Sequence, residues 1–213
     1  PKESEIKNIG LNPDKVLKLI SNGEIEVRGE VFMNKSVFEK INLEQKKLGL
    51  AEYANPRNTA AGSVRQLDPK LAAKRMLDFL AYSLVIDLGQ TEHNQEHSLL
   101  KLLGFKTDTE ARELKNVKEV ESFWNEIHKK REKMAWEIDG LVISVNSNQT
   151  FSKLGVVGKA PRGAVAFKFP GKEATTKVSD IIIQVGRTGV LTPVAVLDAV
   201  DINGVNVTRA TLH

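Results

Sequence analysis

The 213-residue sequence contains no cysteine, which excludes disulfide-stabilised domains and thiolate metal sites. The absence is compatible with a reducing compartment. Long apolar runs and a leader of the charged-then-apolar type are also missing, so we expect neither a membrane span nor a secretory signal. The sequence starts with Pro1 and not with Met, which suggests a processed chain or a fragment of a longer one.

Histidine is scarce, with residues only at positions 93, 97, 128 and 213. His93 and His97 are four apart, within the polar stretch GQTEHNQEHS. This polar context favours a solvated loop over a metal site.

The charge balance is mildly basic, with 31 Lys and Arg against 27 Asp and Glu and a net charge of +4. An excess of this size is compatible with nucleic acid binding only if the basic residues gather on one face. A hydrophobic content of 41% is normal for a packed core. The length allows one large domain, or one domain and part of another.

Hydrophobic periodicity predicts a chain of mixed helices and strands. Amphipathic spacing predicts helices within 12–21, 34–50, 98–105 and 117–136, with Phe38, Ile41 and Leu48 inward in the second of these. Alternating or β-branched runs predict strands at 25–33, 77–89, 140–146 and 163–170. After Pro170 only short strands follow, with a turn expected at Asn203-Gly204. We therefore expect two domains, 1–172 and 173–213, the second being the opening strands of a small β-barrel.

Three charged residues are candidates for a common site. Lys168 lies on the opposite strand face from its apolar neighbours, beside two small alanines, and Glu30 is likewise opposite the apolar set of its strand. Asp139 stands at the start of the strand GLVIS. Any one of these charges alone would more often face solvent, so they form a site only if they converge.

The stretch NPRNTAAGSVRQLDP is the second unusual feature. Asn55-Pro56 favours a turn, and the small residues that follow allow another surface to approach closely. Arg57 and Arg65 bracket these small residues, and guanidinium groups at this spacing suit a phosphate backbone. A glycine-containing loop with two surface arginines explains the composition equally well.

Five stretches, in this order, resemble motifs of the bacterial NAD⁺-dependent DNA ligases: EVRGEVF, ANPRNTAAGSVRQLDP, EIDGLVISVN, PRGAVAFKFP and QVGRTGVLTPVA. The resemblance runs from about Gly23 to the C-terminus. It implies an α+β fold: a nucleotidyltransferase (adenylation) domain of antiparallel sheets with flanking helices, similar to the ATP-grasp ligases, followed by part of an oligonucleotide-binding (OB) barrel. Members of this family seal nicks in duplex DNA by adenylating a lysine from NAD⁺, passing AMP to the 5′-phosphate, and displacing AMP with the 3′-hydroxyl.

The resemblance also implies roles for individual residues. Glu30 matches a carboxylate that contacts the ribose of the adenosine, and Lys168 matches a lysine that neutralises the α-phosphate. Asp139 matches an essential acid near the phosphate and a Mg²⁺ ion, which suits a hard cation. Arginines that face the nicked DNA are matched by Arg57, Arg65, Arg131 and Arg187.

Three departures from the family pattern concern the chemistry. The sequence contains no K-x-D-G motif, whose lysine is the family nucleophile, so we expect this chain alone not to adenylate itself. Ser144 stands where the family has a nucleotide-contacting lysine, and Gly163 stands where it has an aromatic residue. The four-cysteine zinc module of the family is absent from this chain as well.

Three hypotheses therefore remain: part of an NAD⁺-dependent DNA ligase, a nucleotide- or DNA-binding relative without turnover, or an ATP-dependent nucleotidyltransferase such as an RNA ligase or capping enzyme. The long NPRN motif argues against the last. On the first hypothesis we expect a monomer in the bacterial cytoplasm, near the nucleoid, that binds NAD⁺, Mg²⁺ and nicked duplex DNA in replication and repair.

Overall fold

The structure is a computed structural model that describes residues 1–23, 25–202 and 204–212. Its helices are α1 (Glu3–Asn8), α2 (Pro13–Asn22), α3 (Lys35–Lys47), α4 (Pro56–Val64), α5 (Pro69–Lys74), α6 (His93–Leu102), α7 (Val117–Lys130), the 3-10 helix η1 (Arg131–Lys133) and α8 (Asn148–Leu154). Its strands are β1 (Val27–Phe32), β2 (Asp78–Leu84), β3 (Gly140–Ser144), β4 (Val156–Val157), β5 (Ala160–Pro161), β6 (Ala164–Lys168), β7 (Val178–Val185), β8 (Leu191–Ile202) and β9 (Val205–Thr211). Helices and strands alternate irregularly, which confirms the mixed class that the sequence predicts.

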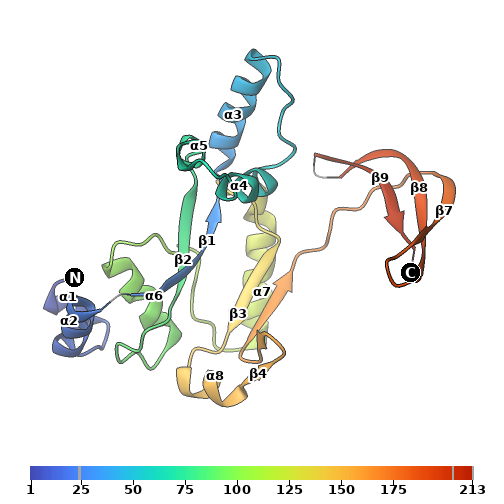
Figure 1. Cartoon of the computed structure of the whole chain (residues 1–213). Coiled ribbons are helices and arrows are strands. Elements are labelled where there is room, and N and C mark those ends of the chain that lie inside the picture. Colours follow the sequence, from blue (N-terminus) through green and yellow to red (C-terminus); the bar gives the residue numbers. More distant parts are fainter. Residues whose placement is uncertain (24, 203, 213) are drawn as a thin grey trace.

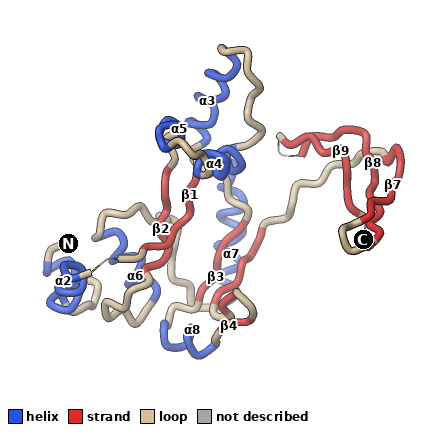
Figure 2. The backbone as a smooth tube through the Cα atoms, in the orientation of Figure 1, coloured by secondary structure: helices blue, strands red, loops and turns tan. Residues whose placement is uncertain are grey.

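Four separate antiparallel sheets make up the strand framework, paired as β1–β2, β3–β6, β4–β5 and β7–β8–β9 (Figures 1 and 2). The long β1–β2 and β3–β6 ribbons form the centre of the larger part of the molecule, with helices at their ends and α7 behind β3 (Figure 1). Within the part of the chain that the structure describes, β7–β9 do not close into a barrel. No described helix is long and apolar enough to cross a membrane.

The main hydrophobic core lies at the N-terminal end of the molecule, where α1, α2 and α6 cover β2. Asn12 caps α2 by accepting a hydrogen bond from the backbone N–H of Lys15. Ile6, on the short helix α1 that periodicity did not reveal, is fully buried. Its burial explains how a polar and lysine-rich N-terminal segment is fixed to the domain.

A second, smaller core of Met33, Ile41 and Ala60 joins α3 and α4 to the end of β1. Ile41 is buried as predicted, but Leu48 is 69% exposed, so the inward position expected for Leu48 is wrong. The cause is the length of α3, which ends at Lys47 and leaves Leu48 at its C-cap.

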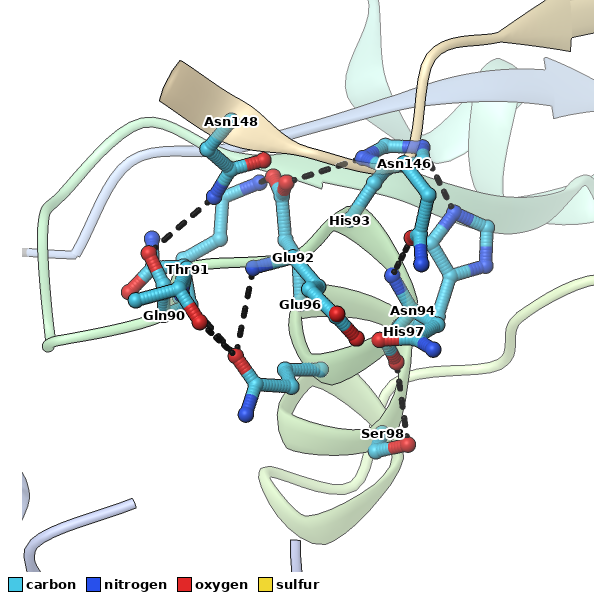
Figure 3. A network of polar contacts seen from close by, with 12 residues as sticks. Gln90, Thr91, Glu92, His93, Asn94, Glu96, His97, Ser98, Asn146 and Asn148 are labelled. Atoms are coloured by element: carbon cyan, nitrogen blue, oxygen red, sulfur yellow. Dashed lines mark hydrogen bonds and ion pairs between the residues drawn. The ribbon is translucent and has the colours of Figure 1, made fainter. Parts of the chain in front are cut away.

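The histidine pair lies on a helix and not in a solvated loop, so that expectation is wrong. α6 begins at His93, because the first turn is held by hydrogen bonds to the segment after β3: His93 N–H donates to the Asn146 carbonyl at 2.8 Å, and Asn148 N–H donates to the Thr91 carbonyl at 2.9 Å (Figure 3). These long-range contacts are invisible in the local sequence. Burial lowers the pKa of His97, which favours its neutral form.

An extended segment, residues 169–177, connects β6 to the β7–β8–β9 sheet (Figure 1). The β8–β9 end of this sheet approaches the segment before α4, where a Cβ on Gly204 would lie 2.5 Å from the Ala54 carbonyl oxygen. β8 and β9 pair as antiparallel strands on either side of the position where the sequence predicts a turn. Gly204 has a φ of +74°, a left-handed conformation that suits glycine. The other residue of the expected turn, Asn203, lies outside the described residues.

Candidate functional site

The pairing of β3 with β6 sets the geometry of the candidate site. Gly140 is opposite Lys168, and Ser144 is opposite Ala164, in a continuous antiparallel register. Paired residues share a sheet face, so Lys168 extends from the same face as Ala166, Ala164 and Ser144. Only small side chains and Val142, which is 75% exposed, accompany the lysine on this face, and 65% of the Lys168 side chain is exposed.

Gly140 allows Asp139 and Lys168 to come together. A Cβ atom at position 140 would lie 2.6 Å from the Cα of Lys168 and 2.7 Å from the carbonyl oxygen of Phe167, closer than real Cβ contacts. The backbone of Asp139 continues the pairing, since its carbonyl accepts a hydrogen bond from Phe169 N–H at 2.8 Å. The glycine therefore lets the acidic residue at the mouth of β3 lie directly beside the end of β6.

Asp139 is the centre of a three-residue ion cluster. Its Oδ2 atom accepts a hydrogen bond from Lys168 Nζ at 2.8 Å and another from Arg57 NH1 at 3.3 Å. The hydrogen bond from Lys168 is the main cause that lowers the pKa of the Asp139 carboxyl below its usual value. Burial opposes it, and Arg57 adds to the lowering. The cluster carries a net charge of +1 and is open to solvent, with 65% of the Lys168 side chain exposed. Such a group can bind an anion.

Arg57 reaches the cluster from α4, a helix on the other side of the site. Pro56 occupies the first turn of α4, and the Asn55 side chain caps it by accepting the Asn58 N–H at 2.8 Å. Asn55-Pro56 thus begins a helix and not a plain turn. Buried Thr59 and Ala60 fix the inner face of α4, and small residues at these positions let it lie close to β1. Its first turn is therefore positioned to direct Arg57 at Asp139.

An aromatic stack supports β6 from the opposite face. The Trp124 ring on α7 lies 5.1 Å from the Phe167 ring and 5.3 Å from the Phe169 ring, and its Nε1 donates to the Phe167 carbonyl at 3.3 Å. Arg131 extends over the Phe169 ring, with its guanidinium carbon 5.3 Å from the ring centroid. These contacts fix the backbone on both sides of Lys168.

The remaining predicted site residues are not in contact with the ion cluster. Glu30 is on β1, in the other ribbon, and its side chain makes no hydrogen bond or ion pair with a described residue. Ser144 is half-buried at the far end of β3, and its hydroxyl makes no hydrogen bond within the described part of the chain. Arg65 is the exposed C-cap residue of α4, and Arg187 is exposed between β7 and β8. Of the three charges expected to converge, Asp139 and Lys168 are therefore in contact and Glu30 is not.

Two supporting residues escaped the sequence interpretation. Trp124 lies one helical turn before His128, whose ring stacks on it with centroids 5.1 Å apart, and this spacing of two rings on one predicted helix is the signal that could have found it. Phe151 on α8 lies against Gly163, where the ideal Cβ position is 2.4 Å from its ring. The Phe151 ring therefore fills the space beside position 163.

The cluster offers a divalent cation one carboxylate. Asp139 Oδ1 has no hydrogen-bond partner among the described residues, and no described group of three or more His, Asp or Glu residues could enclose a metal ion. Mg²⁺ is commonly held by one or two carboxylates together with water and phosphate oxygens. Asp139 can hold Mg²⁺ in this way. The described residues offer no site in which every ligand comes from the protein.

Comparison with protein families gives two matches that together cover nearly the whole chain. Residues 3–172 match the model of the NAD-dependent DNA ligase adenylation domain. Residues 175–213 match the model of the NAD-dependent DNA ligase OB-fold domain.

Individual relatives agree with these matches. The chain is 46% identical over 207 residues to a protein of Koribacter versatilis, which covers 96% of this chain and 31% of the relative. It is 47% identical over 213 residues to a protein of Halothermothrix orenii, covering 99% and 32%, and 45% identical over 210 residues to one of Bacillus subtilis, covering 98% and 30%. All three relatives are named DNA ligase. The chain spans about a third of the length of these relatives.

Proposed function

This chain belongs to the NAD-dependent DNA ligase family, and we propose that it is the part of such an enzyme that activates a phosphate with AMP and holds the nicked duplex. We further propose a division into an adenylation domain, residues 1–172, and the start of an OB domain, residues 173–213. The two family matches and the extended segment 169–177 support this division. We propose that it acts as a monomer in bacterial DNA replication and repair, in the cytoplasm near the nucleoid.

The observation that carries the proposal is the shared Asp139 oxygen, which gathers Lys168 from β6 and Arg57 from α4 into one cationic group. In our proposal Lys168 contacts the α-phosphate of NAD⁺ and offsets the negative charge that builds on it during transfer. A fixed cation at a point of developing charge lowers the barrier without reorganisation. Asp139 holds both cations in place until the phosphate arrives.

NAD⁺ enters this proposal as the donor of AMP, and Mg²⁺ as a Lewis acid that draws charge from the phosphate oxygens. Asp139 would hold Mg²⁺ through Oδ1, with water and phosphate oxygens as the other ligands. Glu30 would accept hydrogen bonds from the ribose hydroxyls. Ser144 would contribute one neutral hydrogen bond at the position where the family carries a lysine.

On the DNA side we assign phosphate contacts to Arg65 and Arg187, supported by their exposure in two different elements. Arg57 contacts the nick phosphate from its place beside Asp139. The Arg131 side chain is only 21% exposed, because it packs on Phe169. We assign to it a DNA contact at the edge of the site.

Binding of a fluorescent nicked duplex across a salt series tests the DNA proposal. We expect affinity to fall steeply between roughly 50 and 200 mM salt, with Arg65→Gln lowering the slope of log K against log salt by about 1. Arg28→Gln is the matched control, because Arg28 is an exposed arginine on β1 that pairs with Glu26, just before that strand. Salt-independent binding, or an equal loss in the control, would contradict the proposal.

The lack of a K-x-D-G motif favours a second assignment for the 213-residue chain by itself: it binds nucleotide and DNA but forms no covalent adenylate. Incubation with NAD⁺ labelled in the adenylyl phosphate, with Mg²⁺, tests this directly. We expect no labelled band at the mass of the chain. A labelled band would identify a nucleophile elsewhere in the sequence.

A further inference from the structure

The stretch HNQEH, residues 93–97, brings two imidazole rings together on one face of α6. His93 and His97 are one helical turn apart, and their Nε2 atoms are separated by 3.2 Å. The rings meet edge to face, with centroids 4.7 Å apart. Both residues are half-buried, and 33% of the His93 side chain is exposed, so a small solute can reach the pair.

Glu96 fixes the orientation of one of these rings. Its side chain is nearly buried, with 9% exposed, and Oε2 lies 3.1 Å from His93 Nδ1. Its other oxygen accepts the backbone N–H of Leu84 on β2. A carboxylate at Nδ1 places the proton on that nitrogen, so the lone pair of His93 is on Nε2 and faces His97 (Figure 3).

We propose that His93 and His97 form a binding site for a divalent transition-metal cation, such as Ni²⁺, Cu²⁺ or Zn²⁺, with Glu96 as the orienting carboxylate. Metal–nitrogen bonds of about 2.0–2.1 Å at a tetrahedral angle place two ligand nitrogens about 3.4 Å apart, close to the separation found here. Small χ2 rotations, which are soft for histidine, turn both lone pairs toward the ion. Carboxylate–histidine–metal arrangements of this kind are usual in metalloproteins.

The site is suited to binding and not to hydrolysis. H-x-x-E-H is also the motif of a class of zinc hydrolases in which the glutamate is free to activate water. Here Glu96 is committed to His93 and to the Leu84 N–H, and it cannot reach a metal-bound water. The remaining positions on the ion are filled by water, because no described group of three or more His, Asp or Glu residues could bind one.

Occupation of the site would stabilise the docking of α6. The first turn of the helix is bonded to the segment after β3, where Asn146 accepts the His93 N–H through its carbonyl and the Asn94 N–H through its side chain. An ion that bridges His93 and His97 ties this turn to the next one. Because the cation binds only the folded helix, the melting temperature rises with its concentration.

Titration of the untagged, chelator-stripped chain with Ni²⁺, Cu²⁺, Zn²⁺ and Mg²⁺ at pH 7.5 tests the proposal, with isothermal calorimetry and thermal melting as readouts. We expect one saturable transition-metal site, tightest for Cu²⁺, at which Mg²⁺ does not compete. We expect His97→Gln to abolish saturable binding and Glu96→Gln to weaken it by about 10- to 100-fold. Retained binding in His97→Gln would overturn the proposal.

Two control variants separate the pair from histidine content and from folding. The double variant His97→Gln/Ser98→His keeps the number of imidazoles but moves one off the shared face, so we expect it to bind no better than His97→Gln. His128→Gln removes a histidine from α7 and should leave the affinity unchanged. Equal losses in the His128 and His97 variants would contradict the assignment. The circular dichroism spectrum of each variant confirms that the helix is retained.

Discussion

At the scale of single residues, the site depends on a few atoms whose positions are set by close backbone contacts. Asp139 and Lys168 meet because position 140 has no side chain, and Arg57 joins them from 82 residues away. All three side chains are more than half exposed, so their ion pairs contribute little to stability. Their value lies in the placement of charge.

Lys168→Met separates function from stability. In the intact ligase we expect ligation to be lost, since no other described cation contacts Asp139 from β6, while the free energy of unfolding changes by less than about 1 kcal/mol. Lys153→Met, at an exposed position on α8, is the control and should keep full activity. A fall in melting temperature typical of a core truncation would show that Lys168 is a structural residue.

Gly140→Ala tests the close approach of the two strands. The new methyl group would overlap the Lys168 backbone, so we expect a loss of about 1–3 kcal/mol and a separation of Asp139 from Lys168. Gly62→Ala is the matched control: a Cβ on this α4 glycine meets nothing within 4 Å, and alanine favours the helix by up to about 1 kcal/mol. Chemical denaturation of both variants gives the comparison, and equal stability of the two would refute the argument.

At the scale of elements, supporting contacts pass between neighbours that local sequence cannot pair. Alternation predicted β1, β2, β3 and β6, and strand parity placed Lys168 on the face with the small alanines. It could not reveal that Arg57 reaches Asp139 or that α6 begins at His93, because each depends on a partner far away in the chain. The Asn55 cap of α4 is a local contact with Asn58, so the Asn55-Pro56 pair could have indicated the start of a helix. The prediction for Glu30 has the same limit. Strand parity predicts which face of β1 carries Glu30, but it cannot predict how far the β1–β2 ribbon lies from the β3–β6 ribbon.

The contact between α8 and the strand region before β6 makes a reciprocal prediction. Gly163→Trp alone should destabilise the chain, because the new side chain would collide with the Phe151 ring. Phe151→Ala alone should also destabilise it by leaving space. The double variant should recover most of the loss, and a double-mutant cycle on thermal stability measures this coupling. Additive losses would show that the two positions do not share one space.

The ion pair between β2 and the segment after α6 gives a pH prediction. Lys106 Nζ lies 2.5 Å from Asp78 Oδ2, and this hydrogen bond holds the pKa of Asp78 below its usual value. Because the pKa of Asp78 is lower in the folded chain than in the unfolded one, its ionised carboxylate stabilises the fold above pH about 4. This stabilisation is lost as the pH falls through the folded pKa. Asp78→Asn should therefore flatten the acid limb of stability against pH. The same substitution in a Lys106→Met background should have a smaller effect, and an equal effect would assign the pKa shift to another cause.

At the scale of the whole molecule, the chain consists of a larger helix-and-sheet part and a three-stranded sheet joined by residues 169–177. This segment has no regular structure and is mostly exposed. The break in composition after Pro170 was visible in the sequence, because helical periodicity ends there. The path of residues 169–177 could not be predicted from the sequence, because no local pattern determines it.

Limited trypsin digestion tests this organisation. We expect the first cleavage at Lys172 or Lys177, because exposed backbone without secondary structure is cut fastest. Lys172→Gln/Lys177→Gln should delay the appearance of the large fragment, which mass spectrometry identifies. First cleavage inside β3 or β6 would contradict the proposed division.

The single Asp139 oxygen that receives both cations has a consequence for selectivity. Any incoming anion must displace a carboxylate that is already in place, so the site sets a threshold of charge and geometry. Chloride and isolated carboxylates offer Lys168 and Arg57 nothing better than they already have. In the proposed function a phosphate group, with more oxygens and more charge, would displace Asp139 from both cations, and the aspartate would thereby select against chloride and isolated carboxylates.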